Sequence, residues 1–377
     1  MTRSNNSATI EAFRLQHPHL RLPDFAYFDL SPTLIQLKKS GLLPVSLYYI
    51  IWQAAAVAQV RRIVSGGRFD IFWHLTFGVI RYPSFVRNLN IPVILGPLGG
   101  GERAPWSMRQ DYGLGGHALD IVRDFFNQIA RLDPLMRLLF QGATLILAKT
   151  NQSARLVSSK HINKTLVELE IGIAEVGKLR GNIGSRPPRL LFAGRFIHWK
   201  GVTLAVRAFA EFVRLGGRGR LTLLGRGPEA IRAKTLSARL GVAELIDWVE
   251  WVEQSQIQHV YDEHDLLLFP SLHDSSGNVV LEALARGLPV ACFDLGGPGE
   301  IATAATGIVL NTKGLTAREA ATKLGQRLYE FFKQPDISEA ASAAAIERAR
   351  QFLWPIRVEK FVNLIEEAIG QRARCRD

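Results

Sequence analysis

The feature that most constrains this chain is a regular alternation of short apolar runs with amphipathic stretches, which continues along nearly the whole sequence. Helix-length stretches such as 204–215 and 279–286 separate the apolar runs. This alternation is typical of βαβ units, so the sequence predicts an α/β protein with parallel sheets. The expected strands are Phe25–Phe28, Phe69–Trp73, Pro92–Leu95, Thr144–Ala148, Leu166–Glu170, Arg189–Ala193, Leu221–Leu224, Leu266–Phe269 and Val290–Phe293.

The length of 377 residues predicts two domains, because single hydrophobic cores stop growing at about 250–300 residues. The Gly- and Pro-rich segment 172–188 separates two series of strands and is interpreted as a linker, with the boundary near residue 180. We expect Rossmann-like domains over 1–180 and 181–354, and a helix over 355–377 that packs back toward the first domain. Ligands bind at the carboxyl ends of parallel strands, so the cleft between the domains is the expected site.

The beginning of the chain is unusual for a doubly wound domain. A polar segment and a helix over Ala8–Gln16 precede the first expected strand at Phe25, where such a domain normally opens with a central strand. We therefore expect the first strand of the N-terminal domain to be missing and the chain to be truncated at its N-terminus.

Charge and cysteine content narrow the class of protein. The net charge is +12, of which residues 1–180 carry +9, but no run of five like charges and no zinc-finger or RNA-recognition signature is present. Nucleic acid is therefore not an expected partner. Cys292 and Cys375 cannot form a disulfide framework, and the N-terminus resembles no secretory signal, so we expect a cytoplasmic protein. The nine histidines show no H-E-x-x-H pattern, and no metal site is expected.

One uncharged stretch, Gly41–Val60, is as long as a membrane span, which needs about 20 residues. Pro44 and two glutamines interrupt it, which favours a buried or interfacial helix over a span. Together with the basic first half, the aromatic pair Tyr48 and Tyr49 suggests a peripheral contact with an anionic membrane surface.

Two segments carry the strongest chemical signal. Leu190–Gly201 reads as strand, turn and helix start, and it places Arg195 and Lys200 in the turn, where two cations and a helix N-terminus can hold a diphosphate. An ordinary solvated surface turn is the alternative. In the second segment, Pro270–Val290, a strand leads through a polar loop into a helix whose first turn carries Glu282. The amides of Gly277, Asn278 and Val279 can bind phosphate or sugar there, and Glu282 can accept from a ribose diol.

These segments resemble a known family. G-R-x-x-x-x-K-G at 194–201, L-G-x-G-P at 224–228 and D-x7-E at 274–282, which runs into L-E-A-L-A-x-G-x-P-V, resemble the retaining glycosyltransferases of family 4, which have the GT-B fold. F-D-x-x-x-H-x-T-F-G at 69–78 and G-P-L-G-G-G-E at 96–102 resemble a bacterial branch that acts on surface polysaccharides.

The resemblance assigns roles to the C-terminal motifs. It implies that Arg195 and Lys200 bind the donor diphosphate, that Glu282 binds the nucleotide ribose, and that the amides of 277–280, including Val280, hold sugar and phosphates. The first acid of the family's motif is usually Glu, and here it is Asp274, one methylene shorter. Asp274 is expected to accept from a donor-sugar hydroxyl or to stabilise developing positive charge.

The N-terminal motifs are expected to complete the site. His74 follows an expected strand, and the resemblance implies a contact with the transferred sugar; a buried histidine with satisfied hydrogen bonds is the alternative. The turn with Gly99 and Gly100 lacks the spacing of a dinucleotide loop and is assigned to the acceptor face together with Glu102. An ordinary helix-start acid is the alternative for Glu102.

The expected function is retaining, metal-independent transfer of a sugar from a nucleotide-diphosphate sugar to a glycan or lipid-linked glycan acceptor, without a cofactor. Fixed cations aimed at the leaving diphosphate would lower the barrier. Two alternatives stay open at this point. One is a nucleotide-sugar epimerase, and the other is a truncated relative that binds nucleotide sugar without turnover.

Overall fold

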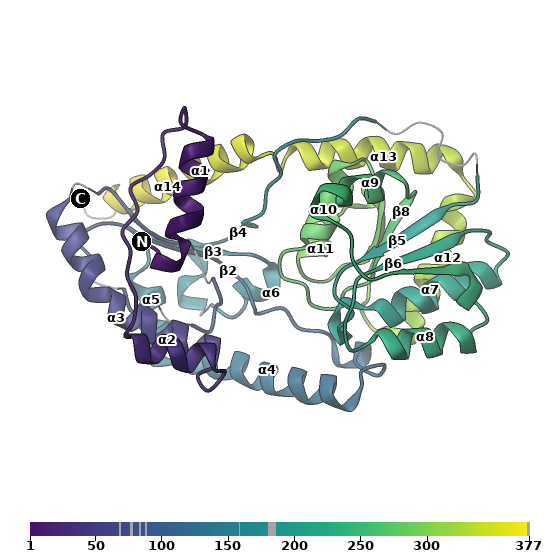
Figure 1. The fold of residues 1–377 in the computed structure, drawn as a ribbon, viewed down its shortest axis with the longest axis horizontal. Coiled ribbons are helices and arrows are strands. Elements are labelled where there is room, and N and C mark those ends of the chain that lie inside the picture. Colours follow the sequence, from purple (N-terminus) through teal and green to yellow (C-terminus); the bar gives the residue numbers. More distant parts are fainter. Residues whose placement is uncertain are drawn as a thin grey trace.

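The computed structural model describes residues 1–67, 69–75, 78–82, 84–86, 89–157, 159–179 and 186–374. Two α/β lobes lie side by side, and each is built around its own sheet (Figure 1). Every described strand pair is parallel, which confirms the predicted fold class. The predicted boundary near residue 180 lies outside the described residues.

The N-terminal lobe holds a four-stranded sheet with the order β1-β2-β3-β4. Its strands are β1 (Phe72–His74), β2 (Val93–Leu98), β3 (Leu145–Ala148) and β4 (Thr165–Val167). The central strands β2 and β3 are buried throughout. Within the described residues before Phe72 no strand joins this sheet, and β1 lies at its edge. That the domain lacks a first strand through truncation stays a prediction.

The expected strand at 25–28 is wrong. Tyr27 forms only an isolated parallel bridge with Thr2, and the neighbouring side chains pack on a helix instead. The ring of Phe28 lies edge-on to Trp52, and the indole N–H of Trp52 donates to the Phe28 carbonyl at 2.9 Å. The aromatic residues that suggested a strand thus form a small separate core with α3.

The helices of this lobe lie around its sheet, and α4 runs from this lobe toward the C-terminal lobe (Figure 1). They are η1 (Ser4–Asn6), α1 (Ser7–Gln16), α2 (Pro32–Lys39), α3 (Val45–Gly66), η2 (Trp106–Met108), α4 (Leu114–Leu132), α5 (Pro134–Gly142), α6 (Asn151–Ala154) and η3 (Ser159–Lys164).

The uncharged stretch Gly41–Val60 contributes most of α3, as the sequence predicts for a buried or interfacial helix. None of the helices in the described part of the chain is long and apolar enough to cross a membrane. Tyr48 and Tyr49 are buried at 2% and 9% exposure, because they pack in the core formed with Phe28 and Trp52. The expectation that these two tyrosines contact a membrane is therefore wrong.

The C-terminal lobe holds a six-stranded sheet with the order β10-β9-β8-β5-β6-β7. Its strands are β5 (Arg189–Ala193), β6 (Arg220–Leu224), β7 (Ile246–Val249), β8 (Leu266–Phe269), β9 (Val290–Phe293) and β10 (Gly307–Leu310). The sequence did not reveal β7 and β10. Both are edge strands that are only partly buried, so they lack the continuous apolar run of a central strand.

The helices of this lobe include α7 and α10, which match the expected stretches 204–215 and 279–286 to within a few residues. The full set is η4 (His198–Lys200), α7 (Val202–Arg214), α8 (Ala230–Arg239), η5 (Ala243–Leu245), η6 (Gln254–Gln256), α9 (Ile257–Asp262), α10 (Asn278–Ala285), α11 (Gly296–Ile301), η7 (Ala304–Thr306), α12 (Ala317–Phe332), α13 (Pro335–Arg350) and α14 (Trp354–Arg374).

The last helix, α14, lies against the N-terminal lobe (Figure 1). Phe361 and Ile365 pack with residues of β2 and β3, and Arg357 forms a buried ion pair with Glu168. At the crossing, the amide of Ile173 donates to the Phe352 carbonyl at 2.9 Å. The chain therefore passes between the lobes at two adjacent points.

Candidate functional site

Two loops of the C-terminal lobe meet at the carboxyl ends of paired strands. The first follows β5 and carries Lys200; the second follows β8 and carries Asp274. The ammonium group of Lys200 forms an ion pair with the Asp274 carboxylate, and both side chains are largely buried. The Trp199 carbonyl accepts the amide of Leu272 at 2.8 Å and so ties the two loops together. The structure thus joins two residues that the sequence assigned to one site.

Glycines allow this close approach. Gly201 caps α7 with φ +79°, and a Cβ there would lie 2.1 Å from the Pro270 carbonyl oxygen. Gly296, with φ +59°, backs the second loop, where a Cβ would lie 2.2 Å from the carbonyl oxygen of Asp274. Larger residues at either position would clash and would also occupy a left-handed conformation that L-residues rarely adopt. The role of Gly296 was not recognised from the sequence.

Helix α10 begins directly after the loop that carries Asp274. Gly277 caps it with φ +72°, and the amides of Asn278 and Val279 lie in the first turn, where a helix leaves N–H groups without an intrahelical acceptor. The Val280 amide differs, because it donates to the Gly277 carbonyl at 2.9 Å. The Asp274 carboxylate accepts weakly from the Ser276 and Gly277 amides at 3.4 Å each. The amides of Asn278 and Val279 are therefore available to donate to an anion.

Glu282 lies one turn further along α10 and is half-buried. The buried hydroxyl of Tyr261 donates to its carboxylate at 2.7 Å. Burial, followed by the charge of Glu282, raises the pKa of Tyr261 well above its ordinary value, so the phenol stays a donor. The interaction fixes the orientation of Glu282 and leaves the rest of its carboxylate available to a ligand.

Arg195 is exposed, and among the described residues its guanidinium forms no hydrogen bond or ion pair. Its neighbour Phe196 is held by the L-G-x-G-P loop: the Phe196 amide donates to the Arg226 carbonyl at 2.9 Å. A Cβ on Gly227 would lie 2.4 Å from the Phe196 carbonyl oxygen. The loop thus supports the backbone beside Arg195 while the cation itself is free to meet a ligand.

The N-terminal lobe contributes a buried carboxylate. Glu102 is 2% exposed and accepts from the Gly100 amide at 2.9 Å and from the hydroxyls of Thr150 and Ser153, both at 2.7 Å. No helix begins at Glu102, so its interpretation as a helix-start acid is wrong. Its three donors show that it shapes the turn of Gly99 and Gly100, which has φ +87° at Gly100.

His74 ends β1, and its ring nitrogen Nε2 lies 3.1 Å from the Gln53 amide nitrogen and 3.4 Å from the Tyr49 hydroxyl. Burial raises the pKa of Tyr49 to about 12, although the bond with Gln53 opposes this. These contacts fit a histidine with satisfied hydrogen bonds. Its contact with a transferred sugar stays a prediction, and two residues of its motif, Thr76 and Phe77, lie outside the described residues.

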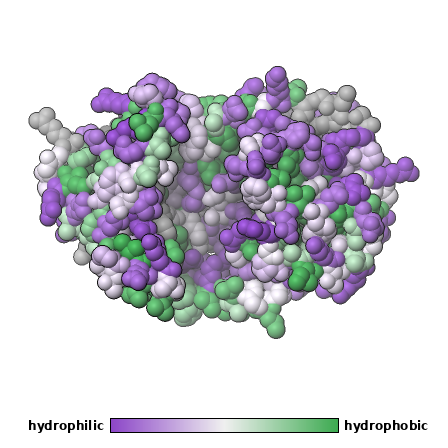
Figure 2. All heavy atoms as spheres, in the orientation of Figure 1, coloured by the Kyte–Doolittle hydropathy of each residue, from purple (hydrophilic) through white to green (hydrophobic). Residues whose placement is uncertain are grey.

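A pocket of about 400 Å³ lies in the hollow between the lobes (Figure 2). Among the predicted site residues, Asp274, Gly100 and Glu102 contribute to its wall, whereas His74 does not. Its described lining consists of Arg81, Gly100, Glu102, Leu119, Asp120, Arg123, Trp199, His273, Asp274 and Ser275.

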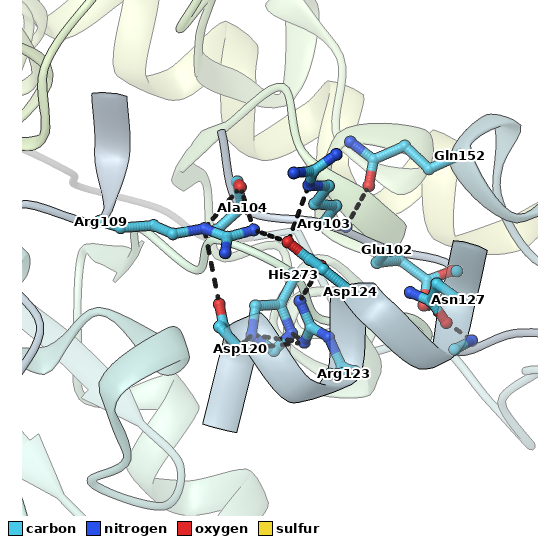
Figure 3. A network of polar contacts seen from close by, with 12 residues as sticks. Glu102, Arg103, Ala104, Arg109, Asp120, Arg123, Asp124, Asn127, Gln152 and His273 are labelled. Carbon is cyan, nitrogen blue, oxygen red and sulfur yellow. Dashed lines mark hydrogen bonds and ion pairs between the residues drawn. The ribbon is translucent and has the colours of Figure 1, made fainter. Parts of the chain in front are cut away.

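A charged network crosses the cleft at this pocket and was not foreseen. Asp120 of α4 lies 3.4 Å from His198 and 3.3 Å from His273 of the other lobe. Arg123, one turn along α4, lies 2.6 Å from a ring nitrogen of His273, and the same helix holds Arg109 through Asp124 (Figure 3). The network fastens α4 to both motif loops of the C-terminal lobe.

Burial and the contacts within this network shift the pKa values of Asp120 and His273. Burial alone raises the pKa of Asp120, but hydrogen bonds with His198 and His273 and the charge of Arg123 outweigh it, so the pKa lies far below the usual range. Burial lowers the pKa of His273, and the interaction with Asp120 opposes the shift. His198 and His273 lie inside the recognised motifs, whereas nothing local marks Asp120 and Arg123 as their partners.

Ligand atoms of Asp120, His198 and His273 lie within 4.8 Å of one another, an arrangement that could hold a metal ion. The surroundings work against a cation, because guanidinium groups of Arg123 and Arg109 lie 3.6 and 3.8 Å from the Asp120 carboxylate. We therefore interpret this group as an interlobe contact.

Comparison with known proteins supports the interpretation of the C-terminal lobe. Residues 178–351 match the family of glycosyl transferases group 1. A 2-deoxystreptamine glucosyltransferase from Streptomyces kanamyceticus is 30% identical over 156 residues, which is 41% of this chain and 40% of that protein. A D-inositol 3-phosphate glycosyltransferase from Corynebacterium aurimucosum is 26% identical over 186 residues, 48% of this chain and 43% of the relative. The matches thus span less than half of these relatives.

Solved structures extend the likeness to both lobes. Sucrose-phosphate synthase from Thermosynechococcus elongatus aligns over 94% of this chain and 84% of its own, with a TM-score of 0.59 and 17% identity. A lipopolysaccharide outer core galactosyltransferase aligns over 85% and 81%, with a TM-score of 0.53 and 17% identity. The fold is therefore the two-domain GT-B fold, and the match to glycosyl transferases group 1 falls on its C-terminal lobe.

Proposed function

We propose that this chain is a glycosyltransferase that moves a sugar from a nucleotide-diphosphate sugar to a glycan or lipid-linked glycan acceptor with retention of configuration. The observation that carries the proposal is the meeting of the two motif loops through Lys200 and Asp274, at the carboxyl ends of paired strands. The match of residues 178–351 to glycosyl transferases group 1 supports it.

The donor would bind along the C-terminal wall of the cleft. Lys200 and Arg195 supply two positive charges, and the first-turn amides of α10 add N–H donors at the positive end of a helix dipole. Charge-assisted hydrogen bonds are the strong class of such contacts, and a diphosphate can accept several at once. Glu282, already oriented by Tyr261, would accept from the ribose hydroxyls.

The acceptor would enter the 400 Å³ pocket, whose walls come from both lobes. The turn of Gly99 and Gly100 forms its N-terminal side and is held in shape by Glu102. Asp274 lies at the boundary between pocket and donor loop, where its carboxylate can meet a hydroxyl of the donor sugar or developing positive charge at the sugar. The acceptor hydroxyl would therefore approach the sugar across the cleft.

The chemistry proposed is metal-independent. As the sugar–phosphate bond breaks, negative charge grows on the leaving diphosphate, and cations fixed in advance stabilise that charge. Lys200 and Arg195 would supply this stabilisation, so no step needs a metal or a cofactor. Since the donor is a nucleotide sugar, a cytoplasmic location fits the proposal best, and nucleic acid plays no part in it.

The experiment is a transfer assay with a panel of nucleotide sugars and glycan or lipid-linked acceptors. The anomeric configuration of the product is read by NMR, and a parallel reaction contains a chelator. The proposal expects a retained anomer, acceptor-dependent turnover and no effect of the chelator. Conversion of the donor sugar without acceptor would indicate an epimerase, and binding without turnover would indicate a non-catalytic relative. Loss of transfer on chelation, restored by metal, would contradict the metal-independent route.

A further inference from the structure

Helix α4 has an inverted distribution of polar and apolar side chains. Its polar residues Asp120, Asp124 and Asn127 are buried, at 2%, 7% and 5% exposure. Its apolar residues face outward: Phe125 and Phe126 are 61% and 54% exposed, with Leu114, Leu119, Ile121, Val122 and Ile129 likewise exposed. A helix of a globular protein normally turns its apolar face to the core. In the described part of the chain, the outer face of α4 is thus an exposed apolar surface.

The inner face explains how α4 tolerates this arrangement. Its carboxylates are paired with Arg103 and Arg109 of the same lobe and with His273 across the cleft. These contacts place charged partners beside both buried carboxylates, so the inner face of α4 is held by polar contacts. Hydrophobic residues gather along the lower edge of the molecule in Figure 2, where α4 runs in Figure 1.

The apolar surface continues beyond α4. Leu135 and Leu138 of α5 are 48% and 42% exposed, and both line a groove of about 270 Å³ against α3. The wall of the groove on the α3 side includes Val57 and Arg61. Contiguous apolar surface of this kind marks an interaction site, because monomeric proteins rarely leave it open.

Charge identifies the kind of partner. The exposed charged residues described on α3 and α5 are Arg61, Arg62 and Arg137, and the acids of α4, Asp120 and Asp124, are buried. The exposed charge described on these helices is therefore positive, and the acid at their junction, Asp133, caps α5 by accepting from the Leu135 amide at 2.8 Å. A second copy of the chain would bring like charges together, whereas an anionic lipid surface accepts both the apolar side chains and the flanking arginines.

We propose that the outer face of α4, with Leu135 and Leu138 of α5, docks on an anionic membrane with Phe125 and Phe126 inserted and with Arg61, Arg62 and Arg137 at the headgroups. Leu119 belongs both to this face and to the wall of the cleft pocket. Docking would hold the pocket at the bilayer surface, where a lipid-linked acceptor is presented. This last point rests on the proposed function; the docking itself does not.

The test is flotation of the full chain with vesicles of phosphatidylcholine alone or mixed with phosphatidylglycerol, at low and high salt. Wild type is expected to float only with the anionic vesicles, and less at high salt. Phe125→Asp with Phe126→Asp should lower the partition coefficient roughly tenfold or more, since two aromatic insertions are lost. Ile231→Asp is the matched control, because Ile231 is 80% exposed on α8 of the other lobe, and it should leave partitioning unchanged.

The role of the flanking arginines is tested by the same flotation assay. Arg61→Glu with Arg62→Glu should abolish the preference for anionic vesicles, and Arg239→Glu, an exposed arginine on α8, should not. Sedimentation and circular dichroism check that each variant keeps its fold and oligomeric state. Absence of wild-type flotation, equal loss in the Ile231 control, or a dimer dispersed by the phenylalanine variant would overturn the proposal. Flotation without any sugar transfer would refute the proposed function and leave the docking surface standing.

Discussion

The ammonium group of Lys200 forms an ion pair with the carboxylate of Asp274, 74 residues away in the sequence. A donor diphosphate would compete with Asp274 for the same cation. We therefore expect donor binding to turn Lys200 toward phosphate and to release Asp274 toward the sugar, so that the acid becomes available only when the donor is present.

Asp274→Asn separates these two roles. The variant should bind a nucleoside diphosphate at least as tightly as wild type, because Lys200 no longer has a competing partner, and it should lose most of its transfer rate. Calorimetry with the nucleoside diphosphate and initial rates with the nucleotide sugar measure the two effects. A parallel fall in affinity and rate would show that Asp274 acts by supporting the loop.

Glu282→Gln and Tyr261→Phe test the ribose contact. Glu282→Gln should reduce the preference for a ribonucleotide over its deoxyribose analogue, and Tyr261→Phe should do the same more weakly, since a neutral hydrogen bond is worth about 0.5–1.5 kcal/mol. Paired titrations of the two nucleotides give the preference directly. Unchanged discrimination in Glu282→Gln would exclude a ribose contact at this residue.

Gly296→Ala and Gly314→Ala form a matched pair for the close packing behind Asp274. Both glycines have positive φ, +59° and +78°, so each alanine costs about 1 kcal/mol in backbone strain. Only at Gly296 would the Cβ also meet the Asp274 carbonyl, at 2.2 Å, whereas nothing lies within 4 Å at Gly314. Urea unfolding should therefore show a larger loss of stability for Gly296→Ala, with loss of transfer. Equal losses of unfolding free energy in the two variants would mean that the backbone near Asp274 can move to accommodate the added Cβ.

The pH dependence of unfolding tests the interlobe network. The pKa of His273 is lowered by burial, so the unfolded chain binds more protons, and the free energy of unfolding should fall as the pH drops below about 6.5. The depressed pKa of Asp120 acts only in more acidic solution, below about pH 4, so the two residues titrate in separate windows.

His273→Phe keeps a ring beside Trp199, which stacks on His273 at 5.0 Å. This variant should show a shallower slope of unfolding free energy between about pH 5 and 7 than wild type, by at most about 1.4 kcal/mol per pH unit. His259→Phe, at an exposed histidine outside the network, serves as the control for the loss of an imidazole ring. Identical slopes for wild type and both variants would contradict the assignment of this pH dependence to His273.

The sequence predicted the positions of the C-terminal motifs better than the contacts between the lobes. Arg195, Lys200 and Asp274 follow strands β5 and β8, and Glu282 lies in the helix that comes next. Their positions follow from local pattern, and the parallel sheet brings the ends of the two strands together. The sequence does not predict the partners of His273, because Asp120 and Arg123 are about 150 residues away along the chain. Only the packing of the two lobes brings these residues together. Local pattern carries no information on such contacts.

The errors have physical causes as well. The half-buried edge strands β7 and β10 lack continuous apolar runs and were missed. The aromatic segment 25–28 packs on α3 and forms no strand. The sequence favours Tyr48 and Tyr49 as residues of a membrane interface, yet their rings fill a core, whereas Phe125 and Phe126 of α4 are exposed. Sequence periodicity identifies an apolar face but does not say whether it turns inward.

Calorimetric titration of wild type, Lys200→Ala and Arg195→Ala with a nucleoside diphosphate and with the matching nucleoside tests the proposed diphosphate site itself. Removing one charge-assisted contact worth about 1.5–3 kcal/mol should weaken the diphosphate roughly 10- to 150-fold and leave the nucleoside almost unaffected. Arg239→Ala, at an exposed arginine of the same lobe, should change neither. Equal losses for both ligands, or no diphosphate binding by wild type across a panel of bases, would contradict the claim that this cleft holds a nucleotide-diphosphate sugar.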